Sequence, residues 1–182
     1  SEDTSLEVKS TMKSGAAIRL GEVNGIRFYT KVDTAKIAEL KADGATVEMG
    51  TLIAPKDLLG NDELTFNLDA GKYVDVAYKA NEYYTEGNFT GIVGSIVNIK
   101  ESNTAFSAEN GNIAREFVGR GYVKVTKDGT TTITYADYSD SNIANNSRSV
   151  AYVSYKLVQD TEIFNQYSKD IQKKKKKWAG LY

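Results

Sequence analysis

The sequence of 182 residues contains no cysteine and no histidine. Without cysteine it can form no disulfide, no thiolate nucleophile and no sulfur-ligated metal site. Without histidine it lacks the side chain that most often acts as a base near neutral pH and most often binds transition metals. The two absences exclude Ser-His-Asp and Cys-His enzymes and argue against a zinc enzyme. Carboxylate chemistry and calcium binding remain open.

Long apolar runs and an excess of one charge are also missing. No stretch approaches the roughly 20 apolar residues that a membrane-spanning helix needs. The 23 basic and 24 acidic side chains leave a net charge of −1, which gives no global attraction to nucleic acid. We therefore expect no transmembrane segment and no nucleic-acid partner. The hydrophobic content of 41% is that of a folded globular protein, and the length suffices for one sizeable core.

The stretch Arg115–Val125, REFVGRGYVKV, has the clearest structural pattern. Its apolar side chains alternate with polar ones, Phe117, Val123 and Val125 on one face and Glu116, Arg120, Tyr122 and Lys124 on the other. This two-residue period predicts a half-buried strand. Gly119 and Gly121 fall on the apolar face, where the missing side chains let another backbone or a ring come close, or where they mark a bulge.

A hairpin is predicted directly after this strand. The pair Asp128-Gly129 separates it from Thr130–Ala136, and Asp-Gly between two β-prone runs is a strong hairpin signal. Alternation and turn residues predict further strands at Ala16–Leu20, Gly25–Val32, Thr46–Ala54, Tyr73–Ala80 and Phe89–Ile99. The polar segments Asn81–Asn88 and Lys100–Asn112 are expected to be loops.

Capping residues and helical spacing predict one early helix and two C-terminal helices. Asp33 or Thr34 caps the first helix, which runs to about Ala42. Ser147 begins the second helix, and Thr161 caps the third. The side chains expected to face inward from the second helix are Val150, Val153 and Leu157.

Strands mainly first and helices last predict an α+β fold. We expect mainly an antiparallel β-sheet or β-sandwich with one early helix and two C-terminal helices. No second domain boundary interrupts the pattern, so residues 1–182 are expected to form a single domain. Within it, residues 1–14 are expected to be a loose N-terminus and residues 161–182 a helical, Lys-rich C-terminal appendage.

A family resemblance is carried by five segments in order. They are AAIRL with GIRFYTKV, GTLIAP, FTGIVGSIVNIKESN, REFVGRGYVKV and NNSRSVAYVSYKL, and they span roughly Ser14 to Gln159. Together they resemble a module of large secreted or cell-wall-attached proteins of gut-type Gram-positive anaerobes. Such modules stand in chains that also carry Ig-like repeats, carbohydrate-active domains or dockerins. The resemblance implies an extracellular location and neighbouring modules of a larger chain, and it carries no catalytic signature.

Aromatic side chains are the first candidate ligand-binding residues. The sequence has 12 Tyr, and Tyr73, Tyr78, Tyr83, Tyr84 and Phe89 gather around one polar segment. Rings on a sheet face or a loop can stack against sugar rings, which suggests a polysaccharide or cell-surface glycan as partner. The alternative is structural, because Tyr favours strands and some of these rings would then belong to the core.

Arginines on polar strand faces are the second candidate group. Arg27 shares its face with Tyr29 and Lys31, and Arg120 lies on the polar face of the predicted hairpin. The planar guanidinium suits a carboxylate or an acidic sugar. Arg115 and Arg148 flank the same region. The alternative is cross-strand pairing with Glu48, Glu116 or Asp137.

Calcium is the one ion that the sequence suggests, and no other cofactor is expected. Asp137, Asp140 and Asn142 place three oxygen side chains at short spacing. The segment lacks the glycine and the distal glutamate of an EF-hand. Asp and Asn are also common in loops for turn formation alone, which leaves a structural alternative.

Two further charged groups allow more than one interpretation. The carboxylates Asp57, Asp62, Glu63 and Asp69 lie around one predicted loop, and a glycosidase needs two such groups held at a defined separation. The run Lys173–Lys177 could bind an anionic wall polymer or a membrane surface. It could equally be a solvated helix C-terminus, where cations stabilise the helix by interacting with its dipole.

The sequence thus favours a non-catalytic extracellular module of a multi-modular surface or secreted protein. Its expected role is binding of carbohydrate or another cell-surface ligand. A structural spacer or adhesion module without a small ligand is one alternative. A carboxylate-dependent glycan hydrolase is the other.

Overall fold

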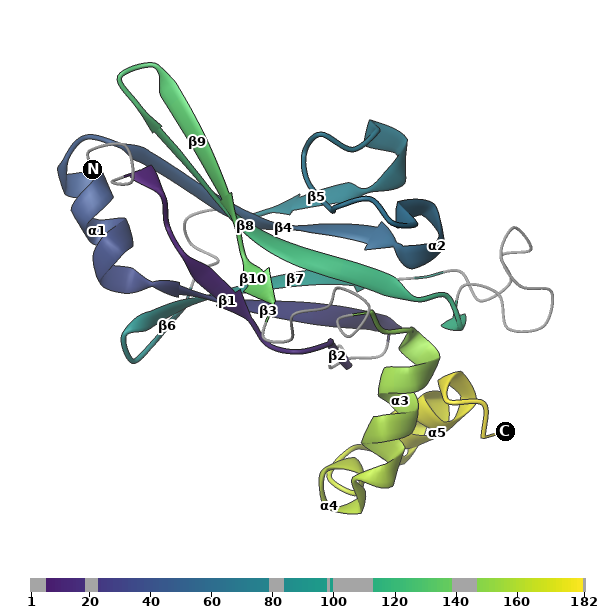
Figure 1. Cartoon of the computed structure of the whole chain (residues 1–182). Helices are drawn as coiled ribbons and strands as arrows, with labels where there is room; N and C mark the ends of the chain where they lie inside the picture. Colours follow the sequence, from purple (N-terminus) through teal and green to yellow (C-terminus); the bar gives the residue numbers. More distant parts are fainter. Residues whose placement is uncertain are drawn as a thin grey trace.

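The structure is a computed structural model of the chain, and it describes residues 6–18, 23–78, 84–97, 99, 113–138 and 147–181. For residues 84–86 and 138 it describes the backbone alone. Two β-sheets lie above a group of C-terminal helices (Figure 1). All strand pairs but one are antiparallel among the described residues, so the predicted α+β class with mainly antiparallel sheet is confirmed.

The first sheet, sheet A, is centred on two long strands. Its spatial order is β10 (Asp137–Tyr138), β1 (Ser10–Met12), β3 (Gly25–Asp33), β7 (Phe89–Val97) and β6 (Tyr84–Glu86), and β2 (Ala17–Ile18) also pairs with β3. The central pair β3/β7 is in register from Gly25↔Val97 to Asp33↔Phe89. On β3 the predicted alternation is confirmed, because every second residue from Ile26 to Val32 is buried and the residues between them, Arg27, Tyr29 and Lys31, are partly exposed.

The second sheet, sheet B, contains the predicted hairpin. Its order is β5 (Val74–Ala77), β4 (Thr46–Pro55), β8 (Phe117–Lys127) and β9 (Thr130–Tyr135). The turn between β8 and β9 has Asp128 at φ 51° and Gly129 at φ 79°. Two successive positive φ angles define the tight turn that matches strand twist, so the hairpin prediction is confirmed.

Sheets A and B pack face to face at the centre of the molecule. A Cβ atom at Gly119 would overlap the ring of Phe28, and one at Gly121 would overlap Thr30. The predicted close approach at these two glycines is therefore confirmed, and the partner is the other sheet. The sheets are also joined at one edge, because β9 continues through the buried Ala136 into β10.

Both faces of β8 are buried along its centre, which corrects the expectation of a half-buried strand. Tyr122 is only 3% exposed, although its position predicted the polar face. The segment between β4 and β5 folds over this outer face of sheet B and places Leu64 and Phe66 against it. The Tyr122 ring meets Phe66 edge-on at 4.9 Å, and its hydroxyl donates to Asp75 Oδ1 at 2.7 Å.

One predicted loop is a hairpin in its described part. Tyr84–Glu86 form β6, which pairs with β7 across a turn at Gly87 and Asn88. Gly87 has φ 61°, a left-handed conformation that glycine adopts freely. The polar composition of Asn81–Asn88 concealed a short β-prone run, Tyr84-Thr85, before a Gly-Asn turn. The predicted loop at Lys100–Asn112 lies outside the described residues.

Helices occur early and at the C-terminus, as predicted. α1 (Thr34–Ala42) is capped by Asp33, whose carboxylate accepts from Ala35 N, and α2 (Lys56–Leu59) is a single turn. The C-terminal helices are α3 (Val150–Gln159), α4 (Thr161–Phe164) and α5 (Lys169–Trp178). Two C-terminal helices were predicted, but Ser168 caps a separate α5, so there are three.

The C-terminal helices share the main core. Val150 and Val153 of α3 and Trp178 of α5 are buried in one cluster with Phe28 and Phe117. Leu157 is only partly buried at the margin of this cluster. Arg148 connects the helices to sheet B, because its backbone exchanges two hydrogen bonds with Phe117 at 2.8 and 3.0 Å.

Candidate functional site

The outer face of sheet A carries cations and rings in alternation. Arg27, Tyr29 and Lys31 of β3 point away from sheet B, since Ile26, Phe28 and Thr30 between them point toward it. Residues paired on antiparallel strands lie side by side on one face. The β7 partners of these three residues are Ser95, Val93 and Gly91, respectively. Two small residues and a valine beside them keep this face open.

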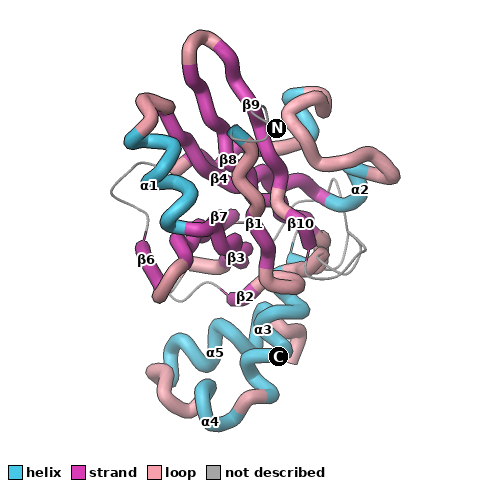
Figure 2. Tube along the Cα trace, turned by 60° about the vertical axis from the view of Figure 1, so that its left-hand side comes forward, coloured by secondary structure: helices cyan, strands magenta, loops and turns pink. Residues whose placement is uncertain are grey.

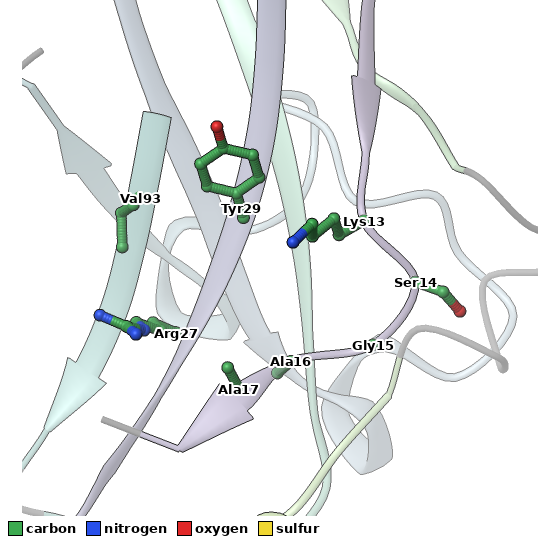
Figure 3. Close-up of a pocket in the computed structure, with 8 residues that line it drawn as sticks. All are labelled: Lys13, Ser14, Gly15, Ala16, Ala17, Arg27, Tyr29 and Val93. Atoms are coloured by element: carbon green, nitrogen blue, oxygen red, sulfur yellow. The ribbon is translucent and has the colours of Figure 1, made fainter. Parts of the chain in front are cut away.

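A shallow groove of about 600 Å³ occupies one half of this face (Figure 3). Arg27 and Tyr29 of β3, Val93 of β7 and the turn at residues 13–17 line it. Figure 3 shows Lys13 extending toward Tyr29 from the turn, and Arg27 extending toward β7. None of the described residues that line the groove is acidic. The groove therefore combines two cations and one ring without a lining carboxylate.

Cation–ring contacts continue along β3. The Lys13 Nζ lies 5.5 Å from the Tyr29 ring centroid, and the Lys31 Nζ lies 5.7 Å from that of Phe89. Phe89 is opposite Asp33 at the end of β3 and is 45% exposed. Each ammonium group thus lies near an aromatic ring on the same sheet face, within the range of a cation–π contact.

Arg27 differs from the other described arginines in lacking an internal partner. Arg115 binds Asp57 with two hydrogen bonds of 2.8 Å, and Arg120 lies over the Tyr135 ring at 5.1 Å. By contrast, no residue in the described ranges forms a hydrogen bond or ion pair with the Arg27 guanidinium. Its side chain is half-buried at the groove. A positive charge held there without a counterion favours an anionic ligand group.

The two arginines proposed from the sequence do not form one cluster. Arg27 is on the outer face of sheet A, whereas Arg120 is on the outer face of sheet B beside Tyr122. Because the sheets pack through their inner faces, the two guanidinium groups point to opposite sides. The alternative prediction paired these arginines with Glu48, Glu116 or Asp137, but the Glu48 carboxylate lies 3.8 Å from the Lys124 Nζ instead. Glu116 likewise pairs with a lysine, Lys56, at 3.6 Å.

The predicted aromatic group is likewise divided. Tyr73 packs partly buried against the cluster on the outer face of sheet B and meets Phe66 edge-on at 6.3 Å. Tyr78 packs partly buried against the cluster under α1. Phe89 alone of the described rings lies exposed on the outer face of sheet A. For Tyr84 only the backbone is described, paired with Gly91, and Tyr83 lies outside the described residues.

The predicted calcium ligands cannot be assembled from the described residues. Asp137 is exposed in β10, opposite Thr11, whereas Asp140 and Asn142 lie outside the described ranges. Among the described residues, no group of three or more acidic side chains is placed to hold a metal ion.

The four loop carboxylates fall into two separate places. Asp62, Glu63 and Asp69 line one shallow depression with Lys72, and Asp57 lines another with Glu116. The hydrogen bonds from Arg115 lower the pKa of Asp57 below its usual value. A general acid in glycoside hydrolysis needs a raised pKa. Asp57 is therefore suited to an ion pair and not to proton donation.

Tyr29 and Lys13 are the site residues that sequence reasoning did not select. Alternation placed Tyr29 on the same face as Arg27, and this was the signal available for it. Lys13 gave no signal, because it directly follows β1 and lies beside Tyr29 only through the pairing of β1 with β3, where its N donates to Tyr29 O at 3.0 Å.

A comparison of the sequence with family models gives no match, and a comparison with curated proteins gives none. In the described part of the chain, no helix is long and apolar enough to span a bilayer.

Proposed function

We propose that the protein is a non-catalytic binding module that binds an acidic polysaccharide on the outer face of sheet A. The observation that carries this proposal is the groove itself. Tyr29 lies there with Lys13 at its ring and Arg27 one alternate position along β3, and no described lining residue is acidic.

The chemistry of these groups fits a sugar acid. A phenol ring offers an apolar surface for the C–H face of a sugar and a hydroxyl for a polar contact. A guanidinium binds a carboxylate through two parallel hydrogen bonds, and such charge-assisted bonds are roughly twice as strong as neutral ones. Residues i and i+2 of a strand are about 7 Å apart. One ligand unit on Tyr29 therefore has Arg27 within reach of its substituents.

The length of the face fits a linear polymer. From Arg27 to the Asp33↔Phe89 pair, β3 extends over six residue steps, or about 20 Å. Cations and rings follow one another along this line, as Arg27, Tyr29, Lys31 and Phe89. A chain of several acidic sugars can place a ring or a carboxylate at each position. A single small ligand would use only the groove.

The extracellular setting of this proposal rests on the family resemblance in the sequence. Polysaccharides are common ligands in the surroundings of a wall-attached or secreted module. A spacer or adhesion module without a ligand is the alternative, and it predicts that the uncompensated Arg27 has no binding role.

Retention on immobilised polygalacturonate, compared with a neutral polysaccharide, tests the proposal. Wild type should be retained on the acidic polymer, and Tyr29→Ala and Arg27→Ala should each lose retention while the melting temperature stays nearly unchanged. Lys124→Ala removes a charge from sheet B and Tyr155→Ala removes an exposed ring from α3, so both are matched controls that should bind as wild type.

Two results would contradict the site. Retention that survives both groove variants would place the ligand elsewhere. Loss in a paired Tyr83→Ala and Tyr84→Ala variant alone would move the site to the segment first suggested by the sequence. Absence of retention on any acidic or neutral polysaccharide would favour the spacer.

A further inference from the structure

The helix α5 is strongly cationic, whereas the rest of the chain has a net negative charge. The ten residues Lys169–Trp178 include six lysines and one aspartate, a net charge of +5. Since the whole chain has a net charge of −1, the remaining residues have −6. The C-terminal helix is therefore a cationic element on an anionic protein.

The helix presents this charge on one side. Gln172, Lys175 and Trp178 are buried, and the Lys175 Nζ lies 4.4 Å from the Trp178 ring centroid. Residues three and four apart share a helix face, so these three fix the inward side. The exposed lysines of the opposite side are Lys169, Lys173, Lys174, Lys176 and Lys177. Figure 2 shows α5 with α3 and α4 at one end of the molecule, away from sheet B.

These charges exceed what the helix needs for its own stability. Cations stabilise only the last turn of a helix through its dipole, and Lys169, Lys173 and Lys174 precede that turn. The pair Lys169 and Lys173 is four residues apart, a spacing at which like charges repel. Within the described residues, none of these three lysines has an ion-pair partner. The repulsion is relieved when an external anionic surface approaches.

Two exposed apolar side chains lie on the segments next to α5. Ile163 is 45% and Leu181 is 50% exposed. Leu181 N donates to Lys176 O at 2.9 Å, and the Lys176 Nζ lies 5.8 Å from the ring of Phe164, the neighbour of Ile163. Lysines together with exposed aliphatic side chains characterise helices that lie in a membrane interface. A soluble polyanion would make no use of the two aliphatic groups.

We propose that α4 and α5 bind the surface of an anionic lipid bilayer, with the lysines at the headgroups and Ile163 and Leu181 inserted between them. Each lysine near such a surface contributes roughly a fivefold gain in partitioning. The interaction is peripheral, since α5 is held to the core by Trp178 and keeps its buried side. It is independent of the sheet A groove, with which it shares no residue.

Co-sedimentation with vesicles tests this proposal. The full chain should bind vesicles of equal phosphatidylglycerol and phosphatidylcholine and should not bind pure phosphatidylcholine. The triple variant Lys169→Gln, Lys173→Gln and Lys174→Gln should weaken partitioning on the order of 100-fold. Its melting temperature should be equal or higher, because like-charge repulsion is removed. A loss of stability would instead indicate a structural role for these lysines.

A second triple variant controls for net charge. Lys41→Gln, Lys124→Gln and Lys127→Gln make the same charge change on α1 and sheet B and should leave partitioning within about threefold of wild type. Equal loss in both triple variants would contradict a localised surface.

The apolar contribution separates a bilayer from a soluble polyanion. Ile163→Ser with Leu181→Ser should weaken vesicle binding at least about tenfold, because two aliphatic side chains no longer insert. If this variant binds as wild type, and long-chain polyphosphate displaces the vesicles from both proteins, the partner is a soluble polyanion and the bilayer proposal fails. Absence of binding to anionic vesicles also overturns it.

Discussion

The close packing of the two sheets at Gly121 gives a sharp prediction. A Cβ atom there would lie within 2.8 Å of Thr30 Cβ and nearer still to the outer atoms of that side chain. Thr30 is fully buried, and its Cβ is fixed to the β3 backbone, so rotation of the side chain cannot relieve the overlap. Gly121→Ala should therefore destabilise the protein even though alanine is better suited than glycine to a strand interior.

The magnitude follows from two opposing effects. Forcing one methyl group into a packed core costs about 1–3 kcal/mol, and replacing glycine in a strand recovers about 0.5–1 kcal/mol. We expect Gly121→Ala to lose about 1–2 kcal/mol of unfolding free energy. Thr30→Ala removes a buried methyl worth about 0.8 kcal/mol, but it also removes a buried hydroxyl that lacks a partner among the described residues. Thr30→Ala alone should be close to neutral.

The double variant measures the contact itself. Thr30→Ala removes the two nearest atoms, Oγ1 and Cγ2, and leaves the Cβ at 2.8 Å. The overlap is then partly relieved, so the two changes should be non-additive by about 1 kcal/mol. Urea unfolding followed by far-ultraviolet circular dichroism gives the three differences, provided that the slope with urea stays constant. If Gly121→Ala is as stable as wild type, or if the two changes add, the sheets do not meet at this point.

Four further predictions follow from individual contacts. Gly129→Val should lower the free energy of unfolding by about 1–2 kcal/mol through the positive φ alone, since a Cβ there meets no atom within 4 Å. Gly71 is equally open but has no positive φ, so Gly71→Val should be nearly neutral when both are measured by denaturant unfolding. Leu157→Ala should cost about 1–2 kcal/mol, below the range for a fully buried leucine, and a cost above 3 would mean a deeper position. Trp178→Ala should lower the free energy of unfolding by about 3–5 kcal/mol and shift the whole transition. A change confined to a separate early transition would mean that α5 unfolds alone. Asp57→Asn should lower stability at neutral pH, because the ion pair with Arg115 lowers the folded-state pKa of Asp57 below its unfolded value near 3.9. The difference from wild type should shrink as pH falls below that unfolded value; a difference that is the same at every pH would contradict the ion pair.

Local sequence signals predicted the elements of this fold well. The Asp128-Gly129 turn, the Asp33 cap and the alternation on β3 depend only on neighbours within a few residues. The close approach at Gly119 and Gly121 was one of two predicted explanations, a bulge being the other, and the contacts with Phe28 and Thr30 select it. These features depend on backbone conformation and side-chain alternation, and both can be predicted from neighbouring residues in the sequence.

The assembly of the site depended on information that no local signal carries. Alternation shows that Arg27 and Arg120 lie on polar faces, but it does not show that β3 and β8 belong to different sheets. Tyr122 was missed as a core residue for a related reason, since the segment that covers it is some sixty residues earlier in the chain. Lys13 lies beside Tyr29 only because β1 pairs with β3.

Arg148 connects the groove on sheet A with the C-terminal helices. Its backbone is bonded to Phe117 at the start of β8, and its guanidinium packs against the turn at Gly15, which lines the groove on sheet A. Its helical neighbour Val150 is buried in the same cluster as Trp178. The groove-lining turn and the lysine-bearing helix are thus attached to the same buried core from two sides. Because no residue is common to both faces, a ligand at either one is expected to leave the other open, and the two proposals stand or fall separately.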